Sequence, residues 1–262
     1  MRFLIKFSKN TIPVSVINQH LVNNYIYQKC LKDDKFYHNT KNNYCVSHLY
    51  GGKLNPITKT IDFPNGAIIA ITSEDEQFLN KIIHGVIKNP EFSHGMKFEG
   101  FDFVSEKMYD GYNYFATLSP FIIRKYISKK EYKFVVLEDE NFFAKANPKT
   151  KGKIEMLPYD KFSEFLTKHT KNKLLSLYPN LNFNNFKIEV TKNPSHKIKV
   201  IFKEFDHNNK RNVINFANQC HVTIYGNKNV IEKIYNIGLG QSTGCGFGTI
   251  YKTENHHIYR KL

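Results

Sequence analysis

The chain has 262 residues, of which 38 are Lys or Arg and 23 are Asp or Glu, giving a formal net charge of +15. Its 41% hydrophobic and 15% aromatic residues supply enough apolar surface for a core, which excludes disorder throughout. The longest apolar run, at 67–71, has five residues, whereas a membrane span needs about 20. The start at 1–7 is too short and too charged for a signal-peptide core, so we expect a cytoplasmic protein without membrane contact.

The first half predicts the order β-α-β-β-α-β. Helices are inferred where apolar residues recur every three or four positions, and strands where polar and apolar residues alternate. The expected elements are a strand at 2–7, a helix at 13–31 starting from Pro13, strands at 44–50 and 67–72, a helix at 75–87, and strands near 97–107 and 112–118.

The second half predicts the same order less clearly. We expect a strand at 132–137, a helix at 160–178, strands at 187–190, 197–205 and 212–225, a short helix at 228–237, and a last strand at 247–252. Two such units indicate an α+β protein with two tandem ferredoxin-like, RRM-like domains, at 1–122 and 123–262.

Positive charge is concentrated in the second half. Residues 1–122 carry 13 Lys and Arg against 11 Asp and Glu, whereas residues 123–262 carry 25 against 12. A polyanionic partner is therefore expected on the second half, with compositional drift toward Lys as the alternative.

The four cysteines, Cys30, Cys45, Cys220 and Cys245, form no C-x-x-C pair, which argues against a zinc ribbon or a redox motif. In a chain without a secretory signal, buried or incidental thiols are the expected state, with two disulfides as the alternative. No metal and no cofactor are expected.

Five of the 14 glycines lie within the eleven residues 238–248. The spacing does not fit a dinucleotide fingerprint, and no lysine completes a P-loop. Such density means either a loop of free N–H groups that can hold a phosphate backbone or a structural bend without a ligand.

This segment, after a short helix and before the last strand, resembles the signature of the repeat-associated (RAMP) Cas proteins. The resemblance is to the CRISPR repeat-RNA endoribonucleases, the sixth Cas family. The start at 1–7 (MRFLIKF) resembles that family's first strand, and 115–120 (FATLSP) resembles the motif that closes its first domain. The resemblance implies two tandem ferredoxin-like domains.

The resemblance also implies a catalytic set. In this family a histidine lies just beyond the first helix, with a tyrosine inside that helix and a lysine shortly after. By position these are His38, Tyr27 and Lys41, with His48 as a second candidate histidine. Histidine suits proton transfer because its pKa is about 6.5, and lysine suits the charge that develops on the phosphorane.

One alternative uses two histidines. The stretch 221–224 (HVTI) matches the H-x-T-apolar motif of two-histidine phosphoesterases, and 38–40 (HNT) is a partial match. Lys41, however, stands where that motif needs an apolar residue. His256 and His257 lack a third metal ligand nearby, and His84 lies among apolar residues typical of packing.

The lysine-rich stretches suit an RNA backbone, with solvated faces as the alternative reading of each one. Lys197 and Lys199 occupy alternate positions of a strand and so share one exposed face. The predicted RNA-binding residues are Gly238, Gly240, Gln241, Ser242, Gly244, Gly246, Gly248, Lys197 and Lys199.

The predicted function is that of a metal-independent endoribonuclease that cuts the repeat of precursor CRISPR RNA and leaves 2′,3′-cyclic phosphate and 5′-hydroxyl ends. The main alternative is a non-catalytic RNA-binding subunit on the same fold. The expected partner is repeat RNA, association with a CRISPR effector complex stays open, and a monomer or a homodimer is expected.

Overall fold

The computed structural model describes residues 1–16, 18–32, 43–192, 196–205 and 211–254. Contacts divide the chain into two units. The first comprises Met1–Ser105 with Gly244–Gly246, and the second begins as Glu106–Thr243 and resumes at Phe247.

The first unit contains a four-stranded antiparallel sheet in the order β3-β6-β1-β7. Its elements alternate in the β-α-β-β-α-β order that the sequence predicts, which is the ferredoxin-like arrangement. They are β1 (Arg2–Phe7), α1 (Gln19–Asn23), the π-helical η1 (Asn24–Cys30), β3 (Tyr44–Val46), β6 (Ala67–Ser73), α3 (Glu76–Lys88) and β7 (Phe98–Val104).

The helix expected at 13–31 begins later than predicted. Val14 is fully buried and pairs with Ile61, so this stretch forms β2 (Val14–Ser15) of a small sheet with β5 (Thr60–Asp62) and β4 (Lys53–Asn55). The helix expected at 75–87 is confirmed as α3. Asp75 caps the start of this helix, since its side chain accepts a hydrogen bond from the Phe78 amide.

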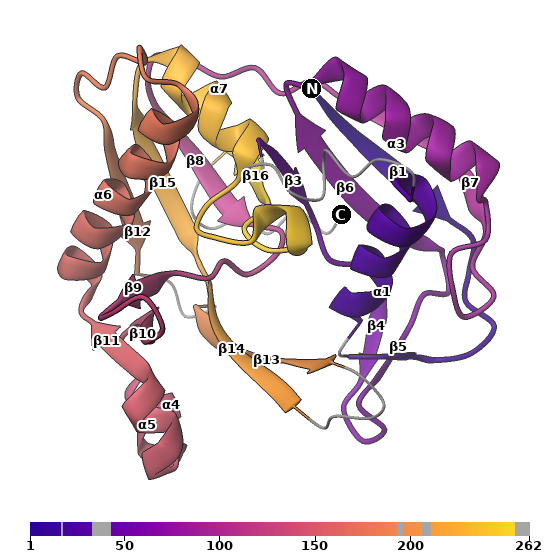
Figure 1. Ribbon diagram of the computed structural model, residues 1–262, viewed down its shortest axis with the longest axis horizontal. Helices are drawn as coiled ribbons and strands as arrows, with labels where there is room; N and C mark the ends of the chain where they lie inside the picture. Colours follow the sequence, from indigo (N-terminus) through magenta and orange to yellow (C-terminus); the bar gives the residue numbers. More distant parts are fainter. Residues whose placement is uncertain (17, 33–42, 193–195, 206–210, 255–262) are drawn as a thin grey trace. The chain divides into compact units, whose positions relative to one another are not determined.

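The second unit repeats the topology. Its main sheet has the order β12-β15-β8-β16, and α6 and α7 pack on one face, where apolar side chains of strands and helices form a single core (Figure 1). The elements are β8 (Gly111–Thr117), α6 (Tyr159–Leu177), β12 (Lys187–Thr191), β15 (His221–Gly226), α7 (Lys228–Ile237) and β16 (Ile250–Thr253).

The first strand of this unit differs from the prediction. The stretch 112–118, assigned to the first half, is β8, which pairs with β15 and β16. The contact-based boundary therefore falls at Ser105/Glu106, earlier than the expected 122/123. The stretch 132–137, expected as the first strand, instead belongs to a separate three-stranded sheet.

Two insertions extend the second unit. The first contains the three-stranded sheet and two short helices, which project beyond β10 and β11 in Figure 1. The second is the hairpin of β13 and β14. The predicted strand 212–225 is therefore two strands, β14 in this hairpin and β15 in the main sheet. The elements are β9 (Arg124–Tyr126), β10 (Tyr132–Leu137), α4 (Glu140–Lys145), α5 (Pro148–Lys153), β11 (Ile154–Leu157), β13 (Lys197–Phe205) and β14 (Arg211–Gln219).

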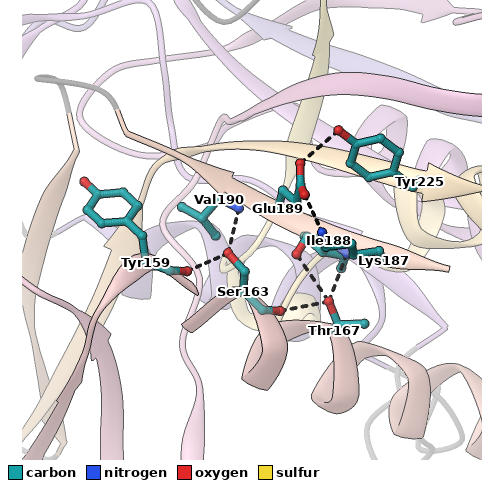
Figure 2. Close-up of polar contacts among 8 residues, drawn as sticks. All are labelled: Tyr159, Ser163, Thr167, Lys187, Ile188, Glu189, Val190 and Tyr225. Carbon is teal, nitrogen blue, oxygen red and sulfur yellow. Dashed lines mark hydrogen bonds and ion pairs between the residues drawn. The ribbon is translucent and has the colours of Figure 1, made fainter. Parts of the chain in front are cut away.

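Helix α6 covers the open edge of β12 with two hydroxyl groups (Figure 2). The Val190 amide donates to Ser163 Oγ at 3.0 Å, and the Ile188 amide donates to Thr167 Oγ1 at 2.9 Å. Unpaired strand edges invite association with other chains, so these bonds protect β12. Within the described ranges, every helix is too short or too polar to cross a membrane.

Candidate functional site

Tyr27 is half-buried in the first unit, on η1. Its hydroxyl donates a hydrogen bond of 2.9 Å to the carbonyl of Gly244 and shares one of 2.5 Å with the hydroxyl of Tyr44. Burial, followed by the neighbouring Tyr44, raises the pKa of Tyr27, and burial raises the pKa of Tyr44 to about 12. Both hydroxyls are therefore protonated at neutral pH, and Tyr27 is suited to donating a hydrogen bond rather than accepting a proton.

The other two predicted catalytic residues, His38 and Lys41, lie outside the described residues. The second candidate, His48, lies against Gly246, where an added Cβ would come within 3.1 Å of the imidazole Cδ2. Burial lowers the pKa of His48 to about 4, so its ring is neutral at pH 7. A pKa so far below the working pH favours a packing role for His48.

The glycine-rich segment folds back on residues 118–122, so two stretches that carry the family resemblance are hydrogen-bonded to each other within the second unit. Several of its amides are therefore already used, and at those positions the segment is a packed bend rather than a row of free N–H groups. The bonds run from Leu239 N–H to Gly248 O at 2.9 Å, from Gln241 N–H to Ile122 O at 2.8 Å, and from Gly248 N–H to Pro120 O at 3.0 Å.

Two glycines are required by close backbone contacts. Gly240 and Gly248 have φ values of +69° and +74°, a region that favours glycine. A Cβ on Gly240 would overlap the carbonyl oxygen of Ile122, and one on Gly248 would overlap that of Leu239. These two residues therefore set the shape of the bend through its backbone contacts.

Lys173 of α6 is anchored in the same bend. Its ammonium donates to the carbonyls of Ile237 at 3.0 Å and Gly240 at 3.1 Å, with longer bonds of 3.3 Å to the Gly238 carbonyl and 3.5 Å to Thr243 Oγ1. The carbonyls at the end of α7 carry the negative end of the helix dipole, which favours a cation there. Lys173 ends the lysine-rich stretch at 168–173, one of those that suit an RNA backbone by sequence. In the structure its ammonium is instead bonded to the carbonyls of the bend.

The polar side chains of the segment are more accessible than its glycines. Gln241 and Ser242 are half-buried, whereas all five glycines are buried. Gln241 Oε1 accepts a hydrogen bond of 3.4 Å from Arg124, which also donates to Asn215 at 3.1 Å. The sequence analysis did not single out Arg124, although it begins a basic stretch at 124–133 that contains two tyrosines.

Lys197 and Lys199 lie on β13 as expected, both exposed, with Ile198 buried between them. Partial burial, followed by the charge of Lys197, lowers the pKa of Lys199. Two ammonium groups on one strand face repel each other, and a phosphate between them would relieve that repulsion.

The four cysteines are free thiols, as expected. Among the described residues, no group of three or more His, Cys, Asp or Glu side chains is placed to hold a metal ion. His221, from the two-histidine alternative, is only 2% exposed on β15.

Comparisons with known proteins agree with this fold. The family model described as CRISPR associated protein Cas6, C-terminal, matches residues 104–251, more than half of the chain. No match was found among curated protein sequences.

Three solved structures are similar over nearly their whole lengths. A structure described as a Cas6-related gene from Pyrococcus furiosus has a TM-score of 0.71 at 18% identity, over 97% of this chain and 99% of that chain. A RAMP protein described as binding different RNA substrates has a TM-score of 0.71 at 18% identity, over 97% and 100%. A structure of Thermus thermophilus Cas6 has a TM-score of 0.52 at 11% identity, over 96% of this chain and 97% of that chain. At these identities the likeness is one of fold, and the expected α+β architecture with tandem ferredoxin-like units is confirmed.

Proposed function

The chain belongs to the Cas6 family of CRISPR-associated proteins, and on that basis we propose that it binds the repeat of precursor CRISPR RNA and cleaves it once per repeat without a metal ion. The observation that carries the proposal is the family match over residues 104–251. The RAMP protein of the same fold that is described as binding different RNA substrates supports RNA as the class of partner.

The proposed chemistry uses the RNA's own 2′-hydroxyl as the nucleophile. A base removes its proton, the oxygen attacks the adjacent phosphorus, and an acid protonates the departing 5′-oxygen. The phosphorus keeps both ribose oxygens, so the products carry a 2′,3′-cyclic phosphate and a 5′-hydroxyl. Each acid or base contributes about 10²- to 10⁴-fold in rate.

In this proposal His38 acts as the general base or the general acid, a water molecule makes the other of the two proton transfers, and Lys41 stabilises the phosphorane. Tyr27 acts as a positioning residue, because its hydroxyl is already bonded to the Gly244 carbonyl and to Tyr44. The low pKa of His48 is the reason to prefer His38. Gln241, Ser242, Lys197 and Lys199 contact the RNA, and the glycines fix the bend that presents the first two.

The test is cleavage of the host's repeat RNA in EDTA by the wild type, by His38→Ala and by the control His84→Ala on α3. We expect one cut in the wild type and the control, and binding without cleavage in His38→Ala. Cleavage that stops in EDTA would contradict metal independence, and cleavage that survives His38→Ala would remove His38 from the mechanism.

The alternative function is a non-catalytic RNA-binding subunit. The observation that favours it is the environment of Tyr27 and His48, neither of which is suited to proton transfer at neutral pH. Tight binding of repeat RNA without cleavage by any variant, with or without Mg²⁺, would establish this function instead.

A further inference from the structure

The face of the second unit's main sheet that points away from α6 and α7 carries tyrosines in register. Ile188, Val222 and Ile224 point toward the helices and are fully buried. Their strand neighbours point the other way, because successive side chains alternate between the faces. On this second face, strand pairing aligns Lys187, Tyr225 and Tyr112 in one row across the sheet, and Glu189, Thr223 and Tyr114 in the next.

The three aromatic rings form one cluster. The centroids of Tyr112 and Tyr114 are 5.4 Å apart with the ring planes at 62°, and those of Tyr112 and Tyr225 are 6.0 Å apart at 45°. Tyr112 is 53% exposed, and Tyr114 and Tyr225 are half-buried. We call Tyr112, Tyr114 and Tyr225 the tyrosine platform.

The platform is held in place from one side. The Tyr225 hydroxyl donates a hydrogen bond of 2.8 Å to Glu189, whose other carboxylate oxygen lies 2.5 Å from the Lys187 ammonium (Figure 2). The Tyr225 ring is therefore fixed before any ligand arrives, which lowers the entropy cost of binding against it.

Three hollows share lining residues with the platform. The first, of about 900 Å³, is lined by Tyr114, Tyr225 and the buried Thr223, among others. A second, of about 390 Å³, is lined by Tyr112, Tyr114 and the ammonium-bearing Lys252, and a third, of about 530 Å³, by Tyr112 and Tyr225. Flat rings therefore stand between concave spaces that can receive flat groups.

Charges of both signs line these hollows, with a small positive excess only in the largest. That hollow has four lysines, Lys168, Lys171, Lys187 and Lys192, against Asp160, Glu164 and Glu189. The second has Lys252, whose ammonium lies 4.2 Å from the Tyr109 ring centroid, against Glu106 and Glu254. Strands β12 and β15 of this sheet lie in residues 123–262, which carry most of the net positive charge, whereas β8 lies in residues 1–122. Exposed aromatic side chains flanked by lysines are the arrangement that binds single-stranded nucleic acid.

We propose that the tyrosine platform stacks unpaired bases of the RNA, as a binding surface additional to the glycine-rich bend. The inference rests on the proposed function for its ligand class. Four-stranded sheets of this topology can present aromatic rings to bases, and stacking tolerates any base because every base has a flat π-face. The platform therefore contributes affinity for unpaired segments and little sequence preference.

The test measures binding by fluorescence anisotropy for the wild type, Tyr112→Ala, Tyr112→Phe and the control Tyr126→Ala. Tyr126 is 61% exposed on β9 in the same unit, so it matches the loss of an exposed tyrosine outside the platform. The probes are the host's repeat RNA, an unpaired RNA of about 10 nucleotides and mixed sequence, and the same sequence as a duplex.

We expect Tyr112→Ala to weaken binding of the unpaired RNA about tenfold, with Tyr112→Phe and Tyr126→Ala close to the wild type. The salt dependence should not change, because no phosphate contact is lost, and duplex binding should be the same in all four proteins. Equal binding by the wild type and Tyr112→Ala would overturn the platform, as would equal losses in Tyr112→Ala and Tyr112→Phe, since a ring remains in the second. A wild type that fails to bind unpaired RNA would also overturn it.

Failure of the proposed function has a different signature. A wild type that binds the unpaired RNA through Tyr112 but neither binds nor cuts repeat RNA would leave the platform standing and overturn repeat processing. If the wild type cuts repeat RNA and Tyr112→Ala changes binding of no probe, repeat processing stands and the platform is overturned.

Discussion

The Tyr27 hydroxyl has a structural task that can be separated from a chemical one. It donates to the Gly244 carbonyl and shares a hydrogen bond with Tyr44, and burial keeps it protonated at neutral pH. Removing a partner from buried hydrogen bonds costs about 1–3 kcal/mol, because the remaining groups lose both the bond and their access to water. We therefore expect Tyr27 to influence the proposed cleavage only through the position of Gly244.

We accordingly predict that Tyr27→Phe lowers the free energy of unfolding by about 1–3 kcal/mol and reduces the cleavage rate without removing a limb of the pH–rate profile. Thermal unfolding and cleavage rates between pH 5 and 9 would measure both effects. Tyr126→Phe, at an exposed tyrosine, is the control and should change neither. A Tyr27→Phe protein of normal stability that lacks one pH limb would instead make Tyr27 an acid or base.

At the scale of elements, α6 organises the second unit in two ways. Its hydroxyls cover the edge of β12, and its Lys173 ammonium gathers carbonyls at the end of α7 and in the glycine-rich bend. The bend is therefore stabilised by a helix more than 60 positions earlier in the chain, and no local pattern in 238–248 reveals that support.

Lys173→Met should loosen the bend. Hydrogen bonds to charged groups are worth about 1.5–3 kcal/mol, so we expect a loss of about 2 kcal/mol of stability and faster hydrogen exchange at Leu239 and Gln241. Lys171→Met removes a lysine two positions away, whose ammonium lies 5.4 Å from the Phe183 ring centroid, and should leave both values near wild type. Equal effects of the two substitutions would contradict a specific anchor at Lys173.

The strand β13 offers a direct test of the predicted phosphate contacts. Lys197→Gln with Lys199→Gln should reduce the slope of log affinity for RNA against log salt by about 1.5, since each phosphate contact contributes about 0.7–0.9. The matched control, Lys161→Gln with Lys228→Gln, removes the same charge from two lysines paired with glutamates. A slope that falls equally in both double variants would mean that net charge alone, and not β13, sets the salt dependence.

At the scale of the whole molecule, the order of elements was predictable and their pairing was less so. Periodicity gave α3 and α7 almost to the residue, because each has an apolar stripe and a side-chain cap at its start. The role of β8 could not be found in this way, since its alternating tyrosines and apolar residues suit either unit. Strand pairing over more than 100 residues decided it.

In the candidate site, too, the local motifs were predictable and their contacts were not. The glycine cluster and the 115–120 motif were visible in the sequence, but their hydrogen bonding to each other was not. The solvent-facing tyrosines of β8 carried a signal, as Tyr112 and Tyr114 stand at alternate positions of a strand. Their partner Tyr225 lies 111 residues later, and only the sheet register brings it alongside.

Buried histidines in both units should make the molecule sensitive to acid. Burial lowers the pKa of His48 to about 4, and burial with the nearby Lys173 lowers that of His169 to about 4. In the unfolded chain the pKa of a histidine is about 6.5. Between pH 6.5 and 4 the unfolded state therefore binds more protons than the folded state, and the free energy of unfolding decreases as the pH falls.

From pH 7 to 5 this loss should reach about 1–2 kcal/mol for each histidine, measured by denaturant unfolding at each pH. Because His48 belongs to the first unit and His169 to the second, His48→Gln should flatten the pH dependence of the first unit's unfolding and His169→Gln that of the second. The comparison is of slopes, so a constant loss of stability from the substitution itself does not affect it. If the double variant keeps the full wild-type dependence of the free energy of unfolding on pH between pH 7 and 5, the acid sensitivity arises from groups other than these two histidines.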